Sequence, residues 1–562
     1  MLRRQGRGPA THVPAPRNAT VAMSAAALLW IPQAALLAWA VQRLATGAGL
    51  AEMLLPAGAY LALGVLRASS EAWGARRLFA AARPQLATLR NQAAQALAAR
   101  SPLDRERLAS GRAASALAEQ AEAVLPWLLR YQPARMRTLL VPPLIALAVL
   151  YYSWTAALIL VLAAPLIPVF MAVIGWRAKA ASEAQLQVIG GMSGLLLDRL
   201  RGLSTLRALD AVDATAQRVR ASADSVRAST MRVLRIAFLS STALELFSAL
   251  GVALVAVYVG FHLLGEIGPG SWGVRLSLAE GLFILLLAPA FFEPLRELAA
   301  VWHDKAAGEA ALEALQELRH AGLALPGALA PQQQPARPGH APVAPSVDIE
   351  GLRFLHPGEA PLFDGEDLYV GAGEHVALVG PSGSGKTTLL AVIAGLAPAS
   401  GGAVRIGGVP LDRHSAAGLR ARMAWIGQKP HVFSGSVRAN VSLERDGIDS
   451  AAVGAAMRRA GLGHVGHATP GASLGEGGLG LSGGELVRLA LARAMCAPQA
   501  GLLLADEPTA HLDHDTAAGV IDALVTLAQG RTLIVATHDL TLAARLGRVV
   551  RIGEPFTKRS AA

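Results

Sequence analysis

The residues with the clearest chemistry form a glycine-rich segment, 380–388, which reads Gly-Pro-Ser-Gly-Ser-Gly-Lys-Thr-Thr. It follows a strand-like apolar run at 375–379 and precedes an apolar helical pattern that extends from 387 to 396. The glycines permit a tight turn in which several backbone N–H groups point at one anion, and the helix N-terminus adds partial positive charge. This context predicts a nucleoside triphosphate site rather than a plain Gly/Ser turn. The predicted phosphate-binding residues are Gly380, Pro381, Ser382, Gly383, Ser384, Gly385, Lys386, Thr387 and Thr388.

Within this loop, Lys386 is expected to reach the β- and γ-phosphates, and the Thr387 hydroxyl to ligate Mg²⁺. Two acids, Asp506 and Glu507, follow an apolar run at 502–505 that has the pattern of a buried strand. A carboxylate at this position suits Asp506 to holding Mg²⁺, directly or through water, and Glu507 to acting as general base. His538 follows another apolar run, at 533–536. It is a candidate for contacting the γ-phosphate and holding the base, with an ordinary surface histidine as the alternative.

A second anion-binding helix start is predicted just before a helical pattern at 486–495. Its residues are Leu481, Ser482, Gly483, Gly484 and Glu485. One nucleotide does not need two phosphate cradles in one domain, so this one is expected to serve a nucleotide held by another domain. The sequence therefore predicts a dimer with ATP at the interface. Gln428, after a strand-like run at 423–427, is a candidate metal and water contact, with a polar surface glutamine as the alternative.

Composition points to the membrane. Of the 562 residues, 53% are hydrophobic and only 16% are charged, whereas soluble proteins carry about 25% charged residues. The length is too great for a single core, so at least two domains are expected. The single cysteine, Cys496, excludes an intrachain disulfide and a cysteine zinc cluster, and is predicted to be a small buried residue.

Six apolar stretches precede residue 300, each about long enough to span a bilayer core of roughly 30 Å. They cover residues 21–42, 50–68, 138–153, 155–176, 237–264 and 276–295. Two long segments lie between these stretches. Segment 69–137 carries eleven arginines and segment 177–236 carries ten lysines and arginines, whereas the short loops at 43–49 and 265–275 contain only Arg43 and Arg275. This asymmetry predicts that the long segments and both termini are cytoplasmic. It also accounts for much of the +11 net charge without nucleic-acid binding.

The predicted fold is that of a multidomain membrane protein, in which a six-helix transmembrane domain is fused to an α/β phosphate-loop domain. We expect a basic tail at 1–20 and a membrane domain at 21–320, which includes two long cytoplasmic helical loops. A Pro/Ala/Gln-rich linker is expected at 321–346, followed by the nucleotide-binding domain at 347–562.

The ordered set of motifs resembles that of ATP-binding-cassette (ABC) proteins. It comprises 380–388, Gln428, 481–485, 504–508, 512–513 and 537–538. Six spans in front of one cassette resemble the half-transporter form of ABC exporters. The resemblance implies ATP and Mg²⁺ as cofactors, two cassettes that close on two ATP molecules, and alternating access driven by hydrolysis. It also implies that His356 takes the place of the adenine-stacking aromatic, that 481–485 is the signature facing the partner's ATP, and that Asp513 lies in the D-loop.

A narrower resemblance is to the CydD-type subunit of the exporter needed for cytochrome bd assembly. The segments that carry it are 197–206, 235–241, 288–296 and 425–433. It implies a heterodimer with a CydC-like half-transporter in the bacterial inner membrane, export of cysteine or glutathione to the periplasm, and a link to haem. The alternatives are haem-linked transport, a general lipid or drug exporter half, and a soluble ABC ATPase acting on nucleic acid. The six spans argue against the last.

Several positions depart from the family pattern or have open roles. The imidazole of His356 offers a smaller stacking face, and Glu485 replaces a glutamine, so modestly altered turnover is expected. Arg67, Arg137 and Arg296 are candidate substrate contacts, with headgroup-facing arginines as the alternative. His262 is a candidate haem or metal ligand or a structural residue. The segment 200–210 is either a coupling segment or an ordinary surface helix.

Overall fold

The computed structural model describes residues 16–553 with gaps at 109, 168, 171–180, 182–183, 186–187, 189–191, 193–194, 197, 201, 269, 274, 321, 329–342, 357–358, 464, 466–468 and 475–480. Most of the expected tail 1–20 and the centre of the expected linker 321–346 therefore lie outside the described residues. The chain divides into two compact units. A membrane unit comprises 1–93 and 110–317, and a cassette unit comprises 94–109 and 318–562.

Helices account for the membrane unit. They are α1 (Arg17–Leu28), α2 (Trp30–Ala45), η1 (Leu50–Met53), α3 (Leu54–Ala98), α4 (Ser110–Ala118), η2 (Gln120–Ala123), α5 (Val124–Pro126), the π-helix η3 (Trp127–Tyr131), α6 (Gln132–Tyr152), α7 (Trp154–Ala163), α9 (Leu203–Ala208), α10 (Val212–Leu264), α11 (Leu278–Ala300) and α12 (Trp302–Arg319). The long helices α3 and α10 continue well beyond their apolar parts into the arginine-rich segments.

Five helical stretches among the described residues are long and apolar enough to cross a membrane: 17–45, 51–98, 110–152, 242–264 and 278–319. The shorter apolar helix α7 lies in the fourth expected span, 155–176, part of which falls outside the described residues. Every expected span thus overlaps an apolar helix.

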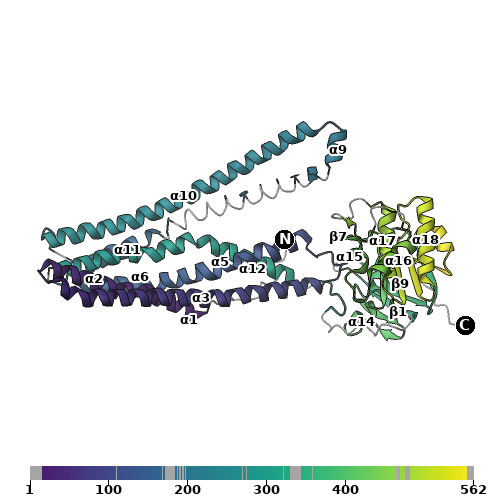
Figure 1. Ribbon diagram of the computed structural model, residues 1–562, viewed down its shortest axis with the longest axis horizontal. Coiled ribbons are helices and arrows are strands. Elements are labelled where there is room, and N and C mark those ends of the chain that lie inside the picture. Colours follow the sequence, from purple (N-terminus) through teal and green to yellow (C-terminus); the bar gives the residue numbers. More distant parts are fainter. Residues whose placement is uncertain are drawn as a thin grey trace. The chain divides into compact units, whose positions relative to one another are not determined.

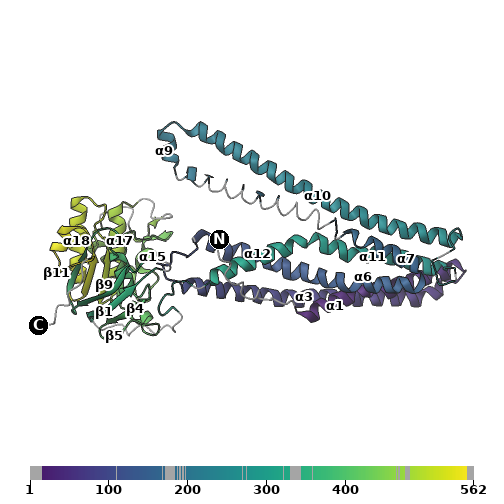
Figure 2. The same ribbon diagram turned by 180° about the vertical axis from the view of Figure 1, so that it is seen from behind.

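The core of the membrane unit lies between α6, α7, α11 and the later half of α10, whereas the first half of α10 diverges from these helices in both views (Figures 1 and 2). Its largest fully buried side chains include Ile145, Leu160 and Phe292. A single extended residue, Ser153, separates α6 from α7. Ser153 N-caps α7 by accepting from the Ala156 N–H at 3.2 Å, and its hydroxyl donates to the Gly270 carbonyl at 2.6 Å. Local capping therefore fixes where α6 ends and α7 begins.

The cassette unit alternates strands and helices. The strands are β1 (Val347–Phe354), β2 (Phe363–Val370), β3 (His375–Val379), β4 (Gly401–Ile406), β5 (Val409–Pro410), β6 (Met423–Ile426), β7 (Gly435–Ser436), β8 (Ser473–Leu474), β9 (Leu502–Asp506), β10 (Thr532–Ala536) and β11 (Arg548–Arg551). The helices are α13 (Lys386–Ile393), α14 (Ala416–Arg420), α15 (Val437–Ser442), α16 (Ser450–Arg459), α17 (Gly483–Met495), α18 (His514–Ala528) and α19 (Leu540–Ala544).

The central sheet is parallel, with the strand order β11-β3-β10-β9-β6. Alternate residues of its strands point to opposite faces, since side chains in a strand have a period of two. Leu503 and Val535 pack in a core with α15 to α18, whereas Leu504 and Ile534 pack in a second core with α13 and the antiparallel sheet β2-β1-β4-β5. Because both faces are covered, the carboxyl ends of β3, β9 and β10 form the open edge where the site residues meet.

The loop at 99–108, which follows α3, folds as part of the cassette unit. The Ser101 hydroxyl donates to the Leu396 carbonyl at 2.6 Å, and Leu103 packs against the core that contains α13. Arg100 and Asp104 form a buried ion pair at 2.7 Å, and Arg105 pairs with Glu359. Sequence periodicity alone did not indicate this grouping, because it depends on contacts between residues about 300 positions apart.

Candidate ATP-hydrolysis site

The predicted phosphate-binding loop connects β3 to α13. Gly383 and Gly385 have φ angles of +83° and +98°, a region that glycine adopts without strain. A Cβ at Gly385 would also lie 2.7 Å from the ring of Phe363, so this turn excludes larger residues. The Lys386 ammonium donates to the carbonyls of Gly380 and Pro381 at 2.9 and 3.0 Å. These bonds hold a nearly buried cation across the loop.

Thr387 and Asp506 come together although 119 residues separate them. The Thr387 hydroxyl donates to Asp506 Oδ1 at 3.1 Å. Burial raises the pKa of the Asp506 carboxyl, as does the adjacent Glu507 charge, while the Thr387 hydrogen bond and Lys386 oppose the rise. The predicted magnesium ligands on the loop and on β9 therefore lie side by side.

Glu507 and His538 also meet at this edge. Residues Ala536 and Asp506 are in register on the parallel strands β10 and β9, so the residues that follow both strands are neighbours. Glu507 Oε2 lies 2.6 Å from His538 Nδ1 and accepts a second hydrogen bond from the His538 amide at 3.3 Å. Its other oxygen lies 4.0 Å from the Lys386 ammonium. A carboxylate in this arrangement is oriented from both sides.

Gln428 and His356, the two other predicted nucleotide contacts, are described by their positions in the fold. Gln428 is exposed two residues after β6, the strand beside β9, so it lies at the same edge of the sheet as Asp506. His356 is only 8% exposed, and its ring packs edge-on against Phe354 with centroids 5.2 Å apart. Little of that imidazole is open for stacking in this structure, and its Nδ1 has no partner among the described residues.

The predicted signature begins α17 with a capping box. The Ser482 hydroxyl accepts from the Glu485 amide at 3.3 Å, and the Glu485 carboxylate accepts from the Ser482 amide at 2.7 Å. Glu485, which replaces the glutamine of the family pattern, therefore has a local structural role, since either side chain can complete a capping box. Leu481 packs at the margin of the core around α17.

The two signature glycines face different surroundings. A Cβ at Gly484 would lie 2.4 Å from Thr516 Cγ2, whereas a Cβ at Gly483 would meet no atom of the described chain within 4 Å. Gly484 therefore permits close packing of α17 on α18, and Gly483 leaves the exposed start of α17 open to another molecule.

Asp513 N-caps α18 by accepting from the Thr516 amide at 2.9 Å, and this backbone hydrogen bond lowers its pKa. Sequence reasoning missed a related contact, in which the Thr509 hydroxyl donates to Asp539 at 2.9 Å. Asp539, the residue directly after His538, also N-caps α19. An Asp before a short apolar helix is the signal that identifies such a cap. These bonds join the segments that carry Glu507 and His538.

The candidate substrate contacts lie in the membrane unit. The Arg67 guanidinium lies over the Trp30 ring at 5.7 Å. Arg137 pairs with Glu71 at 2.6 Å and with Glu297 at 3.3 Å, and both Arg137 and Arg296 line a cavity. His262 is 2% exposed beside Tyr258, and its Nε2 accepts from the Leu276 amide at 3.4 Å. These contacts favour the structural interpretation of His262 over that of a ligand.

The segment at 200–210 contains the short helix α9. An apolar groove there is lined by Leu196, Leu200, Leu203, Leu206 and Val212, among other residues. Leu200 and Leu209 are 67% and 72% exposed. Large exposed leucines around α9 are typical of an interaction surface.

Taken together, the site fits a nucleotide with its magnesium ion. The Ser384 hydroxyl is buried without a partner among the described residues, as suits a group that donates to phosphate. Thr387 and Asp506 offer oxygen ligands, the kind that Mg²⁺ prefers. Bound there, the ion would neutralise charge on the phosphates, while Glu507 is placed to take a proton from water.

Comparison with known proteins agrees with this geometry. The sequence models of the families "ABC transporter transmembrane region" and "ABC transporter" match residues 35–286 and 363–510. A glutathione/L-cysteine transport system ATP-binding/permease protein, CydD, of Haemophilus influenzae is 35% identical over 440 residues, which are 77% of this chain and 72% of that protein. The protein with the same name in Escherichia coli is 36% identical over 441 residues, again 77% and 72%.

A solved structure described as a bacterial Atm1-family ABC exporter with ATP bound superimposes with a TM-score of 0.71 at 21% identity, and covers 96% of this chain and 94% of that one. At this identity the likeness concerns the fold, which is that of an ABC exporter: a helical membrane region fused to a sheet-containing cassette. The chain is therefore a multi-pass membrane protein with an ATPase cassette that couples ATP hydrolysis to transport, and it belongs to the ABC transporter family, among relatives of the CydD type.

Proposed function

We propose that this chain is one half of a heterodimeric exporter in the bacterial inner membrane. It uses ATP to move cysteine or glutathione to the periplasm, in support of cytochrome bd assembly. The observation that carries the proposal is the extended similarity to two proteins named for glutathione/L-cysteine transport, which spans membrane helices as well as the cassette. Similarity confined to the cassette would indicate only ATP hydrolysis.

The proposed roles of the site residues follow from their positions. The loop Gly380–Thr388 would hold the phosphates. The magnesium ion would be held by Thr387, Asp506 and Gln428. Glu507 would act as general base and His538 would position it, since the two side chains are hydrogen-bonded. The signature 481–485 and Asp513 would face the nucleotide of the partner, which the open surroundings of Gly483 support.

Within the same proposal, the cassette and both termini are cytoplasmic, because the arginine-rich segments flank the apolar helices on that side. The proposed membrane domain comprises 21–320 and the proposed nucleotide-binding domain comprises 347–562. Residues 94–109 fold with the cassette unit. The apolar surface at α9 is proposed to couple the membrane unit to the cassette of a CydC-like partner.

The test is transport into inverted membrane vesicles that contain this chain and its partner half-transporter. ATP-dependent uptake of labelled cysteine or glutathione is expected, whereas vesicles with Glu507→Gln in this chain and in the equivalent acid of the partner should show none. An amphipathic dye serves as the competing substrate. Uptake of the dye without either thiol would favour a general drug or lipid exporter and contradict the proposal.

A further inference from the structure

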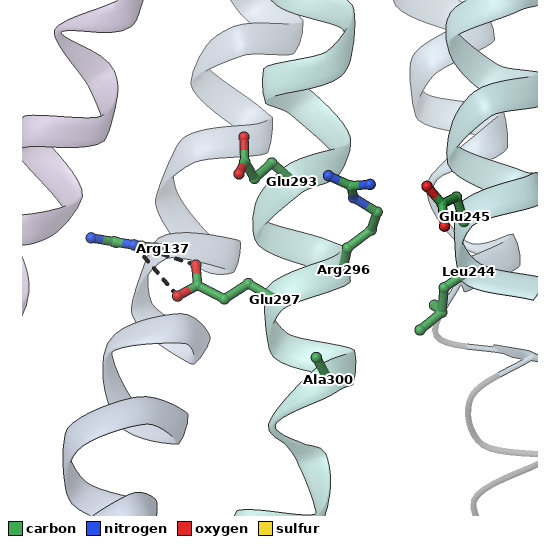
Figure 3. Close-up of a pocket in the computed structure, with 7 residues that line it drawn as sticks. All are labelled: Arg137, Leu244, Glu245, Glu293, Arg296, Glu297 and Ala300. Carbon is green, nitrogen blue, oxygen red and sulfur yellow. Dashed lines mark hydrogen bonds and ion pairs between the residues drawn. The ribbon is translucent and has the colours of Figure 1, made fainter. Parts of the chain in front are cut away.

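A cavity of about 430 Å³ opens between α6, α10 and α11 in the membrane unit (Figure 3). Its lining residues are Arg137, Leu244, Glu245, Glu293, Arg296, Glu297 and Ala300. The volume falls within the roughly 300–1,000 Å³ typical of small-molecule sites. Five of the seven lining side chains are ionisable, although they lie at the ends of apolar helices. A cluster of ionisable groups in a membrane unit makes this cavity a candidate functional site.

The charges of this cavity fall into two sets. Arg137 is already neutralised, since Glu71 and Glu297 lie at 2.6 and 3.3 Å from its guanidinium. By contrast, Arg296, Glu293 and Glu245 form no hydrogen bond or ion pair within the described part of the chain. The second set is therefore available to a ligand.

The Arg296 guanidinium is the centre of the available set. Its Nε is buried without an acceptor, and the side chain lies on the side of α11 that faces α10 (Figure 3). Glu293 lies three residues earlier on α11 and so shares the same helix face, while Glu245 comes from α10 on the other side of the cavity. One cation thus lies between two carboxylates from different helices.

This pattern is complementary to a small zwitterion. A guanidinium binds a carboxylate with two parallel hydrogen bonds, and a carboxylate binds an ammonium group. We infer that the cavity binds the α-amino acid head group of the transported compound, with Arg296 holding its carboxylate and Glu293 and Glu245 holding its ammonium group. The inference rests on the proposed export of cysteine or glutathione, both of which carry this head group.

The charges that line the cavity indicate whether cysteine or glutathione binds more tightly. Glutathione has a second carboxylate, but Arg137 already has two carboxylate partners, so Arg296 is the available cation among the described lining residues. We expect free cysteine to bind more tightly than glutathione. The reverse order would still support recognition of the head group and identify glutathione as its source.

The experiment measures ATP-driven uptake of labelled cysteine by the full heterodimer in inverted vesicles, with unlabelled competitors. Cysteamine lacks the carboxylate, and N-acetylcysteine lacks the ammonium charge. Each is expected to compete on the order of tenfold more weakly than cysteine, the factor typical of losing one hydrogen bond to a charged group. Equal competition by both analogues would overturn the inference without any variant.

Variants then identify the residues. Arg296→Gln is expected to raise the half-saturating concentration of cysteine by about tenfold, and Arg296→Lys to restore part of the loss. Glu293→Gln should weaken cysteine binding and reduce the discrimination against N-acetylcysteine. The control is Arg43→Gln, because Arg43 forms an exposed pair with Glu52 at 3.9 Å outside the cavity, and it should match the wild type.

The two proposals fail in different ways. Wild-type vesicles that take up neither thiol would overturn the proposed function. Normal wild-type uptake, with unchanged half-saturation and unchanged analogue discrimination in Arg296→Gln and Glu293→Gln, would overturn the head-group site alone.

Discussion

Nδ1 of His538 lies 2.6 Å from Oε2 of Glu507, and the amide of His538 donates to the same oxygen. The second carboxylate oxygen of Glu507 faces the Lys386 ammonium at 4.0 Å. One carboxylate therefore connects the loop after β10 with the phosphate-binding loop after β3. The backbone of Glu507 has a φ of +49°, which is unusual for a residue other than glycine. Such a conformation is consistent with a position fixed by function.

Removing only the basicity of Glu507 should separate binding from hydrolysis. Glu507→Gln keeps the size of the side chain but cannot take a proton, so ATP hydrolysis at this site should fall by roughly 10²- to 10⁴-fold while ATP still binds. The measurement is single-turnover hydrolysis in the heterodimer, with the partner's equivalent acid also replaced to remove its contribution. Hydrolysis at the wild-type rate would show that another group acts as the base.

The raised pKa of Asp506 predicts a dependence of stability on pH. Burial first, and the Glu507 charge second, make the folded state bind a proton at this carboxyl more tightly than the unfolded state does. The stability that Asp506 contributes by binding this proton is complete when the pH is below 3.8, the ordinary pKa of the carboxyl. It is lost as the pH rises through the raised pKa of the folded state.

Asp506→Asn should therefore raise the Tm of the nucleotide-free protein at neutral pH, since an asparagine oxygen can still accept from Thr387. The difference from wild type should shrink as the pH is lowered toward 4. Scanning calorimetry across this range checks the sign, and the stabilisation by Mg²⁺-ATP should be lost in the same variant. A Tm below wild type at neutral pH would contradict the burial argument.

The signature glycines should respond to the same substitution in different ways. Gly484→Ala places a Cβ 2.4 Å from Thr516 Cγ2, and such overpacking typically costs about 1–3 kcal/mol of unfolding free energy. Thr516→Ser removes that methyl group and should restore the lost stability in the double variant. Chemical denaturation of the three proteins measures the effect.

Gly483→Ala, by contrast, should leave stability unchanged, because its Cβ would meet nothing in the described chain. It should lower ATP turnover only in the assembled heterodimer, where the signature would face the partner's nucleotide. Unchanged turnover of the heterodimer would argue against that role of the signature.

The loop at 99–108 should depend on the buried pair Arg100–Asp104. Their side chains are 8% and 2% exposed, so Asp104→Ala leaves a buried guanidinium without its partner, at a cost of about 3–5 kcal/mol. Hydrogen exchange of the 95–108 peptide should increase strongly in the full-length protein. The matched control is Arg105→Ala, which breaks the exposed pair with Glu359 and should change the exchange little, since such pairs contribute roughly 0–1 kcal/mol. Equal protection in both variants would exclude Arg100–Asp104 as the anchor.

The sequence by itself predicted a phosphate-binding loop and the two acids after β9, and it indicated the apolar helices and the family. These depend on local order: glycines directly before a helix, carboxylates directly after a buried strand, and apolar stretches long enough for a bilayer. Strand ends in a parallel sheet meet at one edge, and the segments after β3, β9 and β10 bring Thr387, Asp506, Glu507 and His538 together there.

The tertiary structure alone decided which side chains are already paired and which remain available. Glu485 departs from its family pattern, yet it completes a capping box with Ser482, and His356 is packed against Phe354 rather than exposed. Arg137 and Arg296 were equivalent candidates in the sequence, but carboxylates from α3 and α11 neutralise only Arg137. The physical reason is that charge pairing and burial depend on neighbours from distant helices, whose positions no local pattern encodes.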